Sequence, residues 1–325
     1  MKMIDQVAGI IRDFHDFYIM THVNPDGDAI GSLLGMYLAL KENGKIAIPV
    51  VGAEFPQLFK FLPGSGNTVI GFDSVGFRPS HIIALDVAAE NRISPEIGDL
   101  RKSAKLVNVD HHPTNPRYGD YNYVLPSANS TTQLVYQILK RAEYRVSPDV
   151  AKCLYTGLVT DTGCFKFAGV TSETFELAAR LLELGVDNYE ITRKLFEEFP
   201  ESRLSLERLI IERLEVLLNG KLVLSYIDFE DYQKLGASMS EGESLVNRLR
   251  ETRGVEVGGL ITKLSENLYK VSLRSKGFVN VATVASVLGG GGHSRAAGLK
   301  VSMSREEIRE RLIKLIDSSL NSSAT

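Results

Sequence analysis

The run HVNPDGDAIGS, which begins at His22, places a histidine and two aspartates, Asp26 and Asp28, within seven residues. An apolar segment precedes it and a helical pattern follows it, so these side chains lie at the carboxyl end of a predicted strand, where open α/β sheets bind ligands. Pro25 and Gly27 break regular structure, which lets the loop turn the three side chains toward one point. Taken alone, such a loop is more often a turn with solvated carboxylates, in which Asp28 caps the next helix.

Three further segments carry the same residue types. One apolar run ends in Asp86, and a second is followed by Asp110, His111 and His112. The run TGLVTDTGCF adds Asp161 at the end of a predicted helix. A lone aspartate after a buried strand usually caps a helix or stays solvated. Three parallel strands that deliver such residues to one sheet edge gather like charges, which repel one another unless a cation lies between them.

Mixed carboxylate and imidazole ligands suit Mn²⁺, with Mg²⁺, Co²⁺ or Zn²⁺ as alternatives. Carboxylates in Asp-x-Asp spacing can serve two ions about 3.5–4 Å apart. Two such ions activate a water molecule near neutral pH and neutralise charge on the oxygens of a phosphoryl group. The pattern therefore predicts a hydrolase that cleaves phosphoesters with two divalent metal ions.

A glycine run, GGGGHSRAAG, begins at Gly289. On composition alone, four glycines indicate a flexible loop. The charge around them favours a binding role, because the stretch from Asn267 to Arg305 contains six lysines and arginines and no acidic residue. Glycine lets backbone N–H groups approach a phosphate closely, and His293 and Arg295 can add charged donors. This stretch therefore predicts a site for a small anion.

The elements that must position these residues form two patterns. In the first half, short apolar runs alternate with helical periodicity, which predicts an α/β fold whose parallel sheet has helices on both faces. The strands are expected at 18–21, 47–51, 82–85 and 106–109, and the helices at 30–43, 131–143, 149–158 and 172–184. Residues 1–17 have the spacing of an amphipathic first helix.

The pattern of the second half of the sequence predicts a smaller α+β domain. Its strands are expected at 222–227, 255–264 and 268–273, with a helix at 281–288, a further strand, and a closing helix at 305–318. Residues 187–219 read as entirely helical and are expected to bridge the two domains. The predicted domains are 1–186 for catalysis, 187–219 as a helical linker and 220–325 for substrate binding.

Composition excludes several other classes of protein. The chain of 325 residues is 44% hydrophobic and 24% charged, which is ordinary for a globular protein with two cores. Its net charge of −3 argues against a partner such as long nucleic acid, because such binding must neutralise many phosphates. No uncharged apolar run approaches the roughly 20 residues that cross a bilayer, and no secretory signal is present, so we expect a cytoplasmic protein without a membrane partner. Cys153 and Cys164 form neither a CxxC motif nor a Cys/His cluster.

The motifs resemble, in the same order, the four motifs of the DHH phosphoesterase family. They are the run from His22, the lone Asp86, the Asp-His-His from Asp110, and the TGxxTDTGxF pattern around Asp161. The glycine run resembles the GGGH loop of the DHHA1 domain, which binds the terminal phosphate or base of a substrate. Together the two resemblances cover nearly the whole chain.

The resemblance implies a role for each candidate residue. One ion would be held by His22, Asp26 and Asp86, and the other by Asp28, Asp86, His111 and Asp161, with Asp86 as the bridge. His112 would face the scissile phosphate and help to protonate the leaving oxygen, while Asp110 orients it. The implied substrate contacts are Arg274, Ser275, Gly290, Gly291, Gly292, His293, Ser294 and Arg295.

The two-domain arrangement is similar to that of the oligoribonucleases that complete RNA decay, many of which also remove phosphate from 3′-phosphoadenosine 5′-phosphate. The resemblance implies hydrolysis of very short RNA oligonucleotides to mononucleotides, with two Mn²⁺ ions and a glycine loop that measures length. A homodimer is one expected assembly. The alternatives are a phosphodiesterase for linear or cyclic dinucleotides, an exopolyphosphatase, and a pyrophosphatase, although a pyrophosphatase would lack the glycine-histidine loop. A non-catalytic nucleotide sensor would be marked by loss of a ligand such as His22, Asp28 or Asp161, and none is lost.

Overall fold

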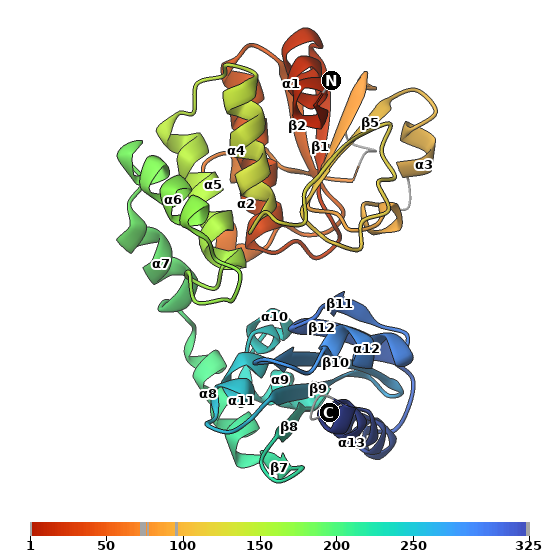
Figure 1. The fold of residues 1–325 in the computed structure, drawn as a ribbon. Coiled ribbons are helices and arrows are strands. Elements are labelled where there is room, and N and C mark those ends of the chain that lie inside the picture. Colours follow the sequence, from red (N-terminus) through yellow and green to blue (C-terminus); the bar gives the residue numbers. More distant parts are fainter. Residues whose placement is uncertain (1, 72–75, 77, 95–96, 323–325) are drawn as a thin grey trace. The chain divides into compact units, whose positions relative to one another are not determined.

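A computed structural model describes residues 2–71, 76, 78–94 and 97–322. The chain divides into two compact units, with the boundary between Glu198 and Phe199 (Figure 1). Each unit has its own sheet of six strands.

The sheet of the first unit is parallel throughout, as predicted, and its strand order is β3-β2-β1-β4-β5-β6. The strands are β1 (Asp16–Met20), β2 (Ile46–Val51), β3 (Val69–Ile70), β4 (His81–Leu85), β5 (Lys105–Asp110) and β6 (Tyr121–Val124). The four expected strands are confirmed to within two residues at each end. The short edge strands β3 and β6 were not expected, because neither has a run of apolar residues long enough to stand out from a loop.

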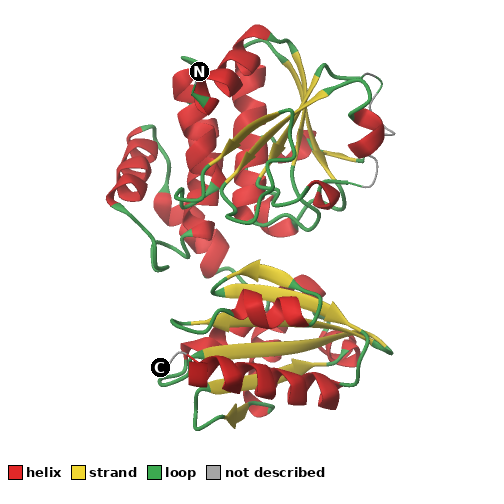
Figure 2. Ribbon diagram, turned by 45° about the vertical axis from the view of Figure 1, so that its right-hand side comes forward, coloured by secondary structure: helices red, strands yellow, loops and turns green. Residues whose placement is uncertain are grey.

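Both faces of this sheet are buried, which explains why its strands are apolar at successive positions. Phe17 and Ile19 of β1 pack into one core, and Tyr18 and Met20, which alternate with them, pack into another. The first core is covered by α1 (Met3–Asp13), α2 (Gly27–Glu42), α4 (Thr131–Arg141) and α5 (Pro148–Asp161). The second is covered by the segment that contains α3 (Ile97–Leu100) (Figure 2).

The predicted helices of the first unit are confirmed, and side chains fix where they begin. The carboxylate of Asp26 accepts hydrogen bonds from the N–H groups of Asp28 and Ala29, so α2 starts three residues before its predicted position. The hydroxyl of Ser147 caps α5, and Pro148 occupies its first turn. Two further helices, α6 (Ser172–Glu183) and α7 (Asn188–Phe196), complete the unit.

A stripe of small residues brings α2 close to α5. Gly27, Gly31 and Gly35 recur every four residues, so they share one face of α2. A Cβ atom at Gly31 would lie 2.5 Å from the carbonyl oxygen of Cys153 and 2.9 Å from the backbone nitrogen of Gly157. The two helices therefore approach at backbone distance, and this packing holds the start of α2 beside the end of α5.

We expect Gly31→Ala to destabilise the protein by about 3 kcal/mol, because the new methyl group meets backbone atoms that can move only if the helices separate. Gly9→Ala in α1 is the matched control. A Cβ there would meet no atom closer than 3.9 Å, and alanine is the better helix former, so that variant should be as stable as the parent or slightly more stable. Urea unfolding followed by circular dichroism measures both, and equal stabilities would contradict the close packing.

The second unit has a mixed sheet with the order β11-β12-β10-β9-β8-β7, in which only β8 and β9 are parallel neighbours. Its strands are β7 (Glu215–Leu217), β8 (Leu222–Ile227), β9 (Val257–Ser265), β10 (Leu268–Ser275), β11 (Gly291–His293) and β12 (Ala296–Val301). Its helices are α8 (Glu201–Glu212), α9 (Phe229–Leu235), α10 (Met239–Glu243), α11 (Val246–Glu251), α12 (Val281–Val287) and α13 (Arg305–Ser322). The predicted α+β character of this half is confirmed.

The prediction of one unbroken helical stretch over 187–219 is wrong. The stretch is interrupted before Pro200, which caps α8 and cannot continue a helix because it lacks an N–H group. At the other end, β7 pairs with β8 as an antiparallel hairpin. Asn219 and Gly220 in its turn have positive φ angles of 53° and 82°, and an Asn-Gly pair is a hairpin signal that the helical spacing of nearby leucines concealed.

Candidate functional site

The chemistry-bearing residues gather where the strand order of the first sheet reverses. From β1 the chain proceeds to β2 and β3 on one side, and then to β4 and β5 on the other. Open α/β sheets form a crevice at this switch point, outside the carboxyl ends of the strands. His22 follows the end of β1, Asp86 follows β4, and His111 follows β5. The backbone of Asp86 has a positive φ of 61°, a conformation that aspartate tolerates and that ends the strand.

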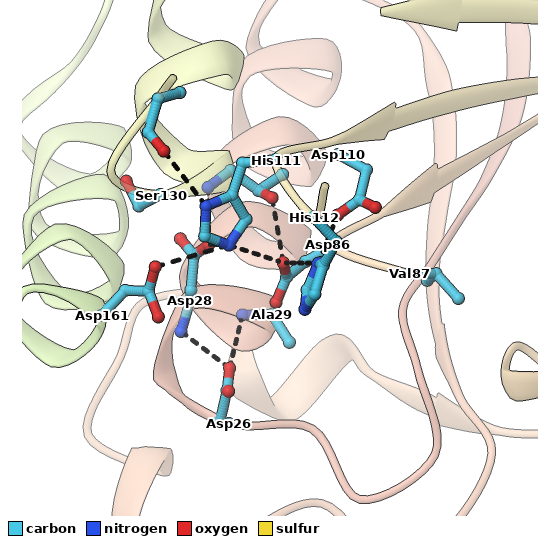
Figure 3. Close-up of polar contacts among 12 residues, drawn as sticks. Asp26, Asp28, Ala29, Asp86, Val87, Asp110, His111, His112, Ser130 and Asp161 are labelled. Carbon is cyan, nitrogen blue, oxygen red and sulfur yellow. Dashed lines mark hydrogen bonds and ion pairs between the residues drawn. The ribbon is translucent and has the colours of Figure 1, made fainter. Parts of the chain in front are cut away.

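His111 lies among three carboxylates from three different elements (Figure 3). Its Nε2 atom is 3.4 Å from an oxygen of Asp161, 3.6 Å from Asp86 and 3.9 Å from Asp28. Asp28 belongs to α2 and Asp161 to the end of α5, so the close packing of these helices is what brings the two together. Candidate ligand atoms of Asp28, His111 and Asp161 all lie within 4.8 Å of one another.

A second group of candidate ligands includes Asp86, which lies close to His111 of the first group. His22, Asp26 and Asp86 also place ligand atoms within 4.8 Å of one another, and Nε2 of His22 is 3.8 Å from an Asp86 oxygen. His112 lies on the same side, with Nδ1 3.5 Å from Asp86. Asp86 also forms a third such group with His111 and His112, so it links the His22 group to His111. The structure therefore brings together all six residues that the sequence singled out as metal ligands.

Hydrogen bonds to Nδ1 orient the rings of both candidate histidine ligands so that their Nε2 atoms face the carboxylates. Nδ1 of His22 lies 2.8 Å from the carbonyl oxygen of Val23, and Nδ1 of His111 lies 3.2 Å from that of Ala128. A carbonyl can only accept, so in each ring Nδ1 carries the proton. In the neutral form of the ring, which is the form that binds metals, the lone pair is then on Nε2, and this atom faces Asp86 and its neighbours.

The beginning of α4 holds the carboxylates, a role that was not predicted from the sequence. The N–H groups of Thr131 and Thr132 donate to the two oxygens of Asp28, at 2.5 and 3.0 Å. The hydroxyl of Thr131 also donates to Asp86, at 3.0 Å. Helix N-termini favour anions, because their first N–H groups have no partner within the helix. The feature of the sequence that indicates this helix start is Ser130, whose hydroxyl caps α4.

The carboxylates around His111 repel one another, which favours a bound cation. Burial, followed by repulsion from Asp86, raises the pKa of Asp28 to about 7, and burial with neighbouring carboxylates raises the pKa of Asp86 to about 6. Burial and Asp28 also raise the pKa of Asp161 well above its usual range. Although burial alone would lower it, the three carboxylates raise the pKa of His111 to about 9. A divalent ion would remove this repulsion, so the donor set fits a metal.

Asp110 and His112 form a separate pair beside this cluster. Nδ1 of His112 donates to Asp110 at 2.7 Å, and the other oxygen of Asp110 accepts from the amide of Asn115 at 2.6 Å. Against the effect of burial, these two hydrogen bonds lower the pKa of Asp110, and Asp110 in turn raises the pKa of His112. Asn115 was not singled out from the sequence, because no local motif marks a residue whose role is to fix a distant carboxylate.

The predicted anion site lies in the second unit, on β10 and the hairpin of β11 with β12. The guanidinium of Arg274 is partly buried, and burial followed by repulsion from Arg250 lowers its pKa. Among the described residues no ion pair is formed by Arg274 or by the exposed Arg295. Ser275 is buried, and its hydroxyl donates to the carbonyl of Ser294 at 3.4 Å, so it holds the hairpin in place.

The glycines of this hairpin have different structural roles. A Cβ at Gly290 would lie 2.4 Å from the carbonyl oxygen of Gly298, and one at Gly292 would lie 2.5 Å from that of Ala296. These two glycines are required for close pairing with β12. Gly291 lies between them with no neighbouring atom within 4 Å of a Cβ, so its backbone stays open to a ligand. His293 and Ser294 follow as exposed residues.

Comparison with known families assigns both units. The model of the DHH family, N-terminal domain, matches residues 16–158, and the model of the DHHA1 domain matches residues 219–322. A protein of Thermus thermophilus named bifunctional oligoribonuclease and PAP phosphatase NrnA is 35% identical over 97% of this chain and 93% of its own length. The chain belongs to the DHH family. It is therefore a hydrolase with the DHH and DHHA1 domains that its motifs predicted.

Other DHH relatives are similar over nearly their whole length. The Bacillus subtilis protein of the same name is 28% identical over 86% of this chain and 87% of its own. The crystal structure of an exopolyphosphatase-related protein from Bacteroides fragilis, 29% identical, superposes with a TM-score of 0.88 over 98% of this chain and 96% of that one. Within the part of the chain that the structure describes, no helix is long and apolar enough to cross a membrane.

We expect bound Mn²⁺ to stabilise this DHH domain. Saturating Mn²⁺ should raise the unfolding temperature by about 5 °C over the protein with EDTA, because an ion that binds only the folded site shifts the folding equilibrium. Since the pKa of Asp28 is about 7, protons compete with the ion, and the difference should shrink as the pH falls from 8 to 6. Differential scanning fluorimetry measures the shift. Unfolding temperatures that do not respond to Mn²⁺ or EDTA would count against a metal centre.

Proposed function

We propose that this protein hydrolyses very short RNA oligonucleotides to mononucleotides, and that it also removes phosphate from 3′-phosphoadenosine 5′-phosphate. The observation that carries the proposal is the convergence of six ligand-type side chains on the switch point of the DHH sheet. The relatives from Thermus thermophilus and Bacillus subtilis, which match over most of the chain, bear the names of these two activities. Short RNA and small nucleotides are therefore its proposed substrates.

The proposed cofactors are two divalent ions, of which Mn²⁺ suits the mixture of imidazole and carboxylate best. One ion would be held by His22, Asp26 and Asp86, and the other by Asp28, Asp86, His111 and Asp161. When bound, such ions supply an activated water near neutral pH and neutralise the charge of the phosphoryl oxygens. The shared position of Asp86 and its 3.6 Å distance from His111 support its role as the bridge.

His112 is the proposed proton donor to the leaving oxygen. Asp110 accepts from its Nδ1 atom and raises its pKa, so that the ring keeps a proton to give near neutral pH. Asn115 holds Asp110 through its second oxygen, which prevents the carboxylate from turning away. Asp110 is thus the residue that orients the acid, and Asn115 supports it.

The DHHA1 domain is proposed to bind the phosphate or base at the far end of the substrate. Arg274 and Arg295 lack a carboxylate partner among the described residues, and the open backbone of Gly291 can approach a phosphate. His293 and Ser294 are exposed beside them, while Gly290, Gly292 and Ser275 shape the hairpin. Charge-assisted hydrogen bonds of this kind are among the stronger ones available to a protein.

A side-by-side assay tests the proposal. A dinucleotide, a longer RNA, 3′-phosphoadenosine 5′-phosphate, pyrophosphate and polyphosphate are compared with Mn²⁺. We expect the dinucleotide and 3′-phosphoadenosine 5′-phosphate to be turned over fastest. The similarity to an exopolyphosphatase-related protein makes polyphosphate the second candidate. Preferential turnover of polyphosphate or pyrophosphate would overturn the RNA proposal without affecting the metal centre.

A further inference from the structure

Three phenylalanines, Phe165, Phe167 and Phe175, follow the metal-ligand candidate Asp161. Phe165 and Phe175 form what we call the aromatic patch, and Phe167 lies between them in the sequence. The rings of Phe165 and Phe175 stack with their centroids 5.2 Å apart and their planes at 25°. Phe175 is 54% exposed and Phe167 is 43% exposed. Single exposed apolar side chains are normal, but several that gather beside a functional site mark a binding surface.

The backbone under the aromatic patch is unusual. Gly163, Cys164 and Phe165 have positive φ angles of 57°, 58° and 61° in succession. Only glycine adopts this left-handed conformation readily, and side chains held in it cluster at functional sites. The turn is fixed by the hydroxyl of Thr162, which accepts from the N–H of Phe165. It redirects the chain at the end of α5 and places Phe165 between Tyr155 and Phe175.

Asn129 joins the aromatic patch to the metal centre. Its amide nitrogen donates to the carbonyl of Gly169, at the end of the turn, and its oxygen accepts from the hydroxyl of Thr174, next to Phe175. Residues close to Asn129 in the sequence hold the candidate ligands. The carbonyl of Ala128 accepts from His111, and Thr131 donates to Asp28 and Asp86. The patch is thus tied to the same segment that positions the metal ligands.

We propose that the aromatic patch is a stacking platform for a nucleobase of the substrate, and that Phe175 is a specificity-determining residue. This inference rests on the proposed function, since it concerns the nucleotide whose phosphate lies at the metal centre. Base stacking on aromatic rings is tolerant of sequence, because every base presents a π-face. A platform of phenylalanines offers no hydrogen bond to base edges, so it selects for the presence of a base and not for its identity.

The first test compares substrates with and without bases. Phe175→Leu keeps an apolar side chain but removes the aromatic face. We expect KM for a 5′-phosphorylated diadenosine dinucleotide to rise about tenfold with little change in kcat. A dinucleotide that lacks the stacked base should be cleaved equally by variant and parent, so one of the two singly abasic analogues should be insensitive to the substitution. Phe14→Leu is the control. Phe14 is 44% exposed and lies before β1, at the amino ends of the strands, whereas the candidate site lies at their carboxyl ends.

The second test is a binding measurement that needs no catalysis. The chain contains no tryptophan, so Phe175→Trp introduces a single tryptophan, which can be excited at wavelengths that tyrosine does not absorb. Adenosine 5′-monophosphate should quench its emission, whereas ribose 5-phosphate should not, since the sugar phosphate has no base to stack. A Phe14→Trp protein should respond to neither ligand.

The outcomes separate this inference from the proposed function. Turnover of the dinucleotide by the parent tests the proposed function, and the ratio of variant to parent tests the platform. Equal losses on the normal and both abasic dinucleotides would mean that Phe175 supports the metal centre and would overturn the platform. An unchanged KM with no quenching by adenosine 5′-monophosphate would also overturn it, and would leave a surface for another protein as the explanation of the exposed rings.

Discussion

Asp86→Asn abolishes hydrolysis while the protein remains folded: this is the largest effect that we expect from any single substitution. The loss should be roughly a thousandfold or more, which corresponds to about 4 kcal/mol of transition-state stabilisation. Asparagine has the same shape as aspartate but no charge. Asp86 groups with His22 and Asp26, and one of its oxygens lies 3.6 Å from Nε2 of His111, so its carboxylate is close to both groups of candidate ligands. Without it, neither group keeps enough negative charge to hold its ion.

Asp161→Asn should also abolish hydrolysis. Asp161 belongs to only one group of candidate ligands, the one with Asp28 and His111, so the substitution should remove a ligand of one ion. The control is Asp231→Asn in the second unit. Asp231 is buried and pairs with Arg213, so its loss should lower stability but leave turnover nearly unchanged. Steady-state assays with saturating Mn²⁺ decide the matter. Near-normal turnover by either site variant would show that the assignment of two ions is wrong.

Arg295→Ala is expected to weaken hydrolysis of a dinucleotide by about tenfold to a hundredfold. A hydrogen bond from a guanidinium to phosphate contributes roughly 1.5–3 kcal/mol, and Arg295 has no carboxylate partner among the described residues to compete for it. The metal centre should be untouched. Methyl p-nitrophenyl phosphate, which has no distal phosphate or base, should therefore be cleaved about equally by variant and parent.

Lys300→Ala is the matched control for this prediction. Lys300 is exposed on β12 in the same stretch without acidic residues, so a general effect of positive charge would weaken both variants alike. Activity of the parent should also decline as RNA grows beyond a few nucleotides, because the far end of the substrate must reach the glycine hairpin. Equal losses on the dinucleotide and the small ester would assign Arg295 to the fold, and undiminished cleavage of long RNA would remove the idea that the hairpin measures length.

The sequence could predict the strands and the candidate ligands because both depend on local patterns. Each core strand is a short apolar run, and burial on both faces of the sheet requires such runs. Asp86 and His111 stand directly after two of these strands, so the parallel sheet alone brings them to one edge. Asp161 was predicted from its place at the end of a helical pattern and from its motif, whereas the packing of α5 against α2 that brings it to the site is visible only in the structure.

The residues that support the site could not be predicted in this way. Each of them acts through a hydrogen bond to a residue that only the folded chain brings close. Thr131 bonds to Asp28, Asn115 to Asp110, and Asn129 to Gly169. Their residue types are common in loops and caps, so nothing local distinguishes them. The strand β7 was missed for a related reason: its three residues continue the helical spacing of α8, and only pairing with β8 makes them a strand.

A crystal structure of the protein grown with Mn²⁺, with anomalous diffraction data, would show whether two ions bind at the switch point of the DHH sheet. We expect two anomalous peaks on either side of the Asp86 carboxylate, about 3.5–4 Å apart. One should lie within bonding distance of His22 and Asp26, and the other within bonding distance of Asp28, His111 and Asp161. A single peak, or peaks that do not contact Asp86, would contradict a two-ion centre at the switch point of the DHH sheet.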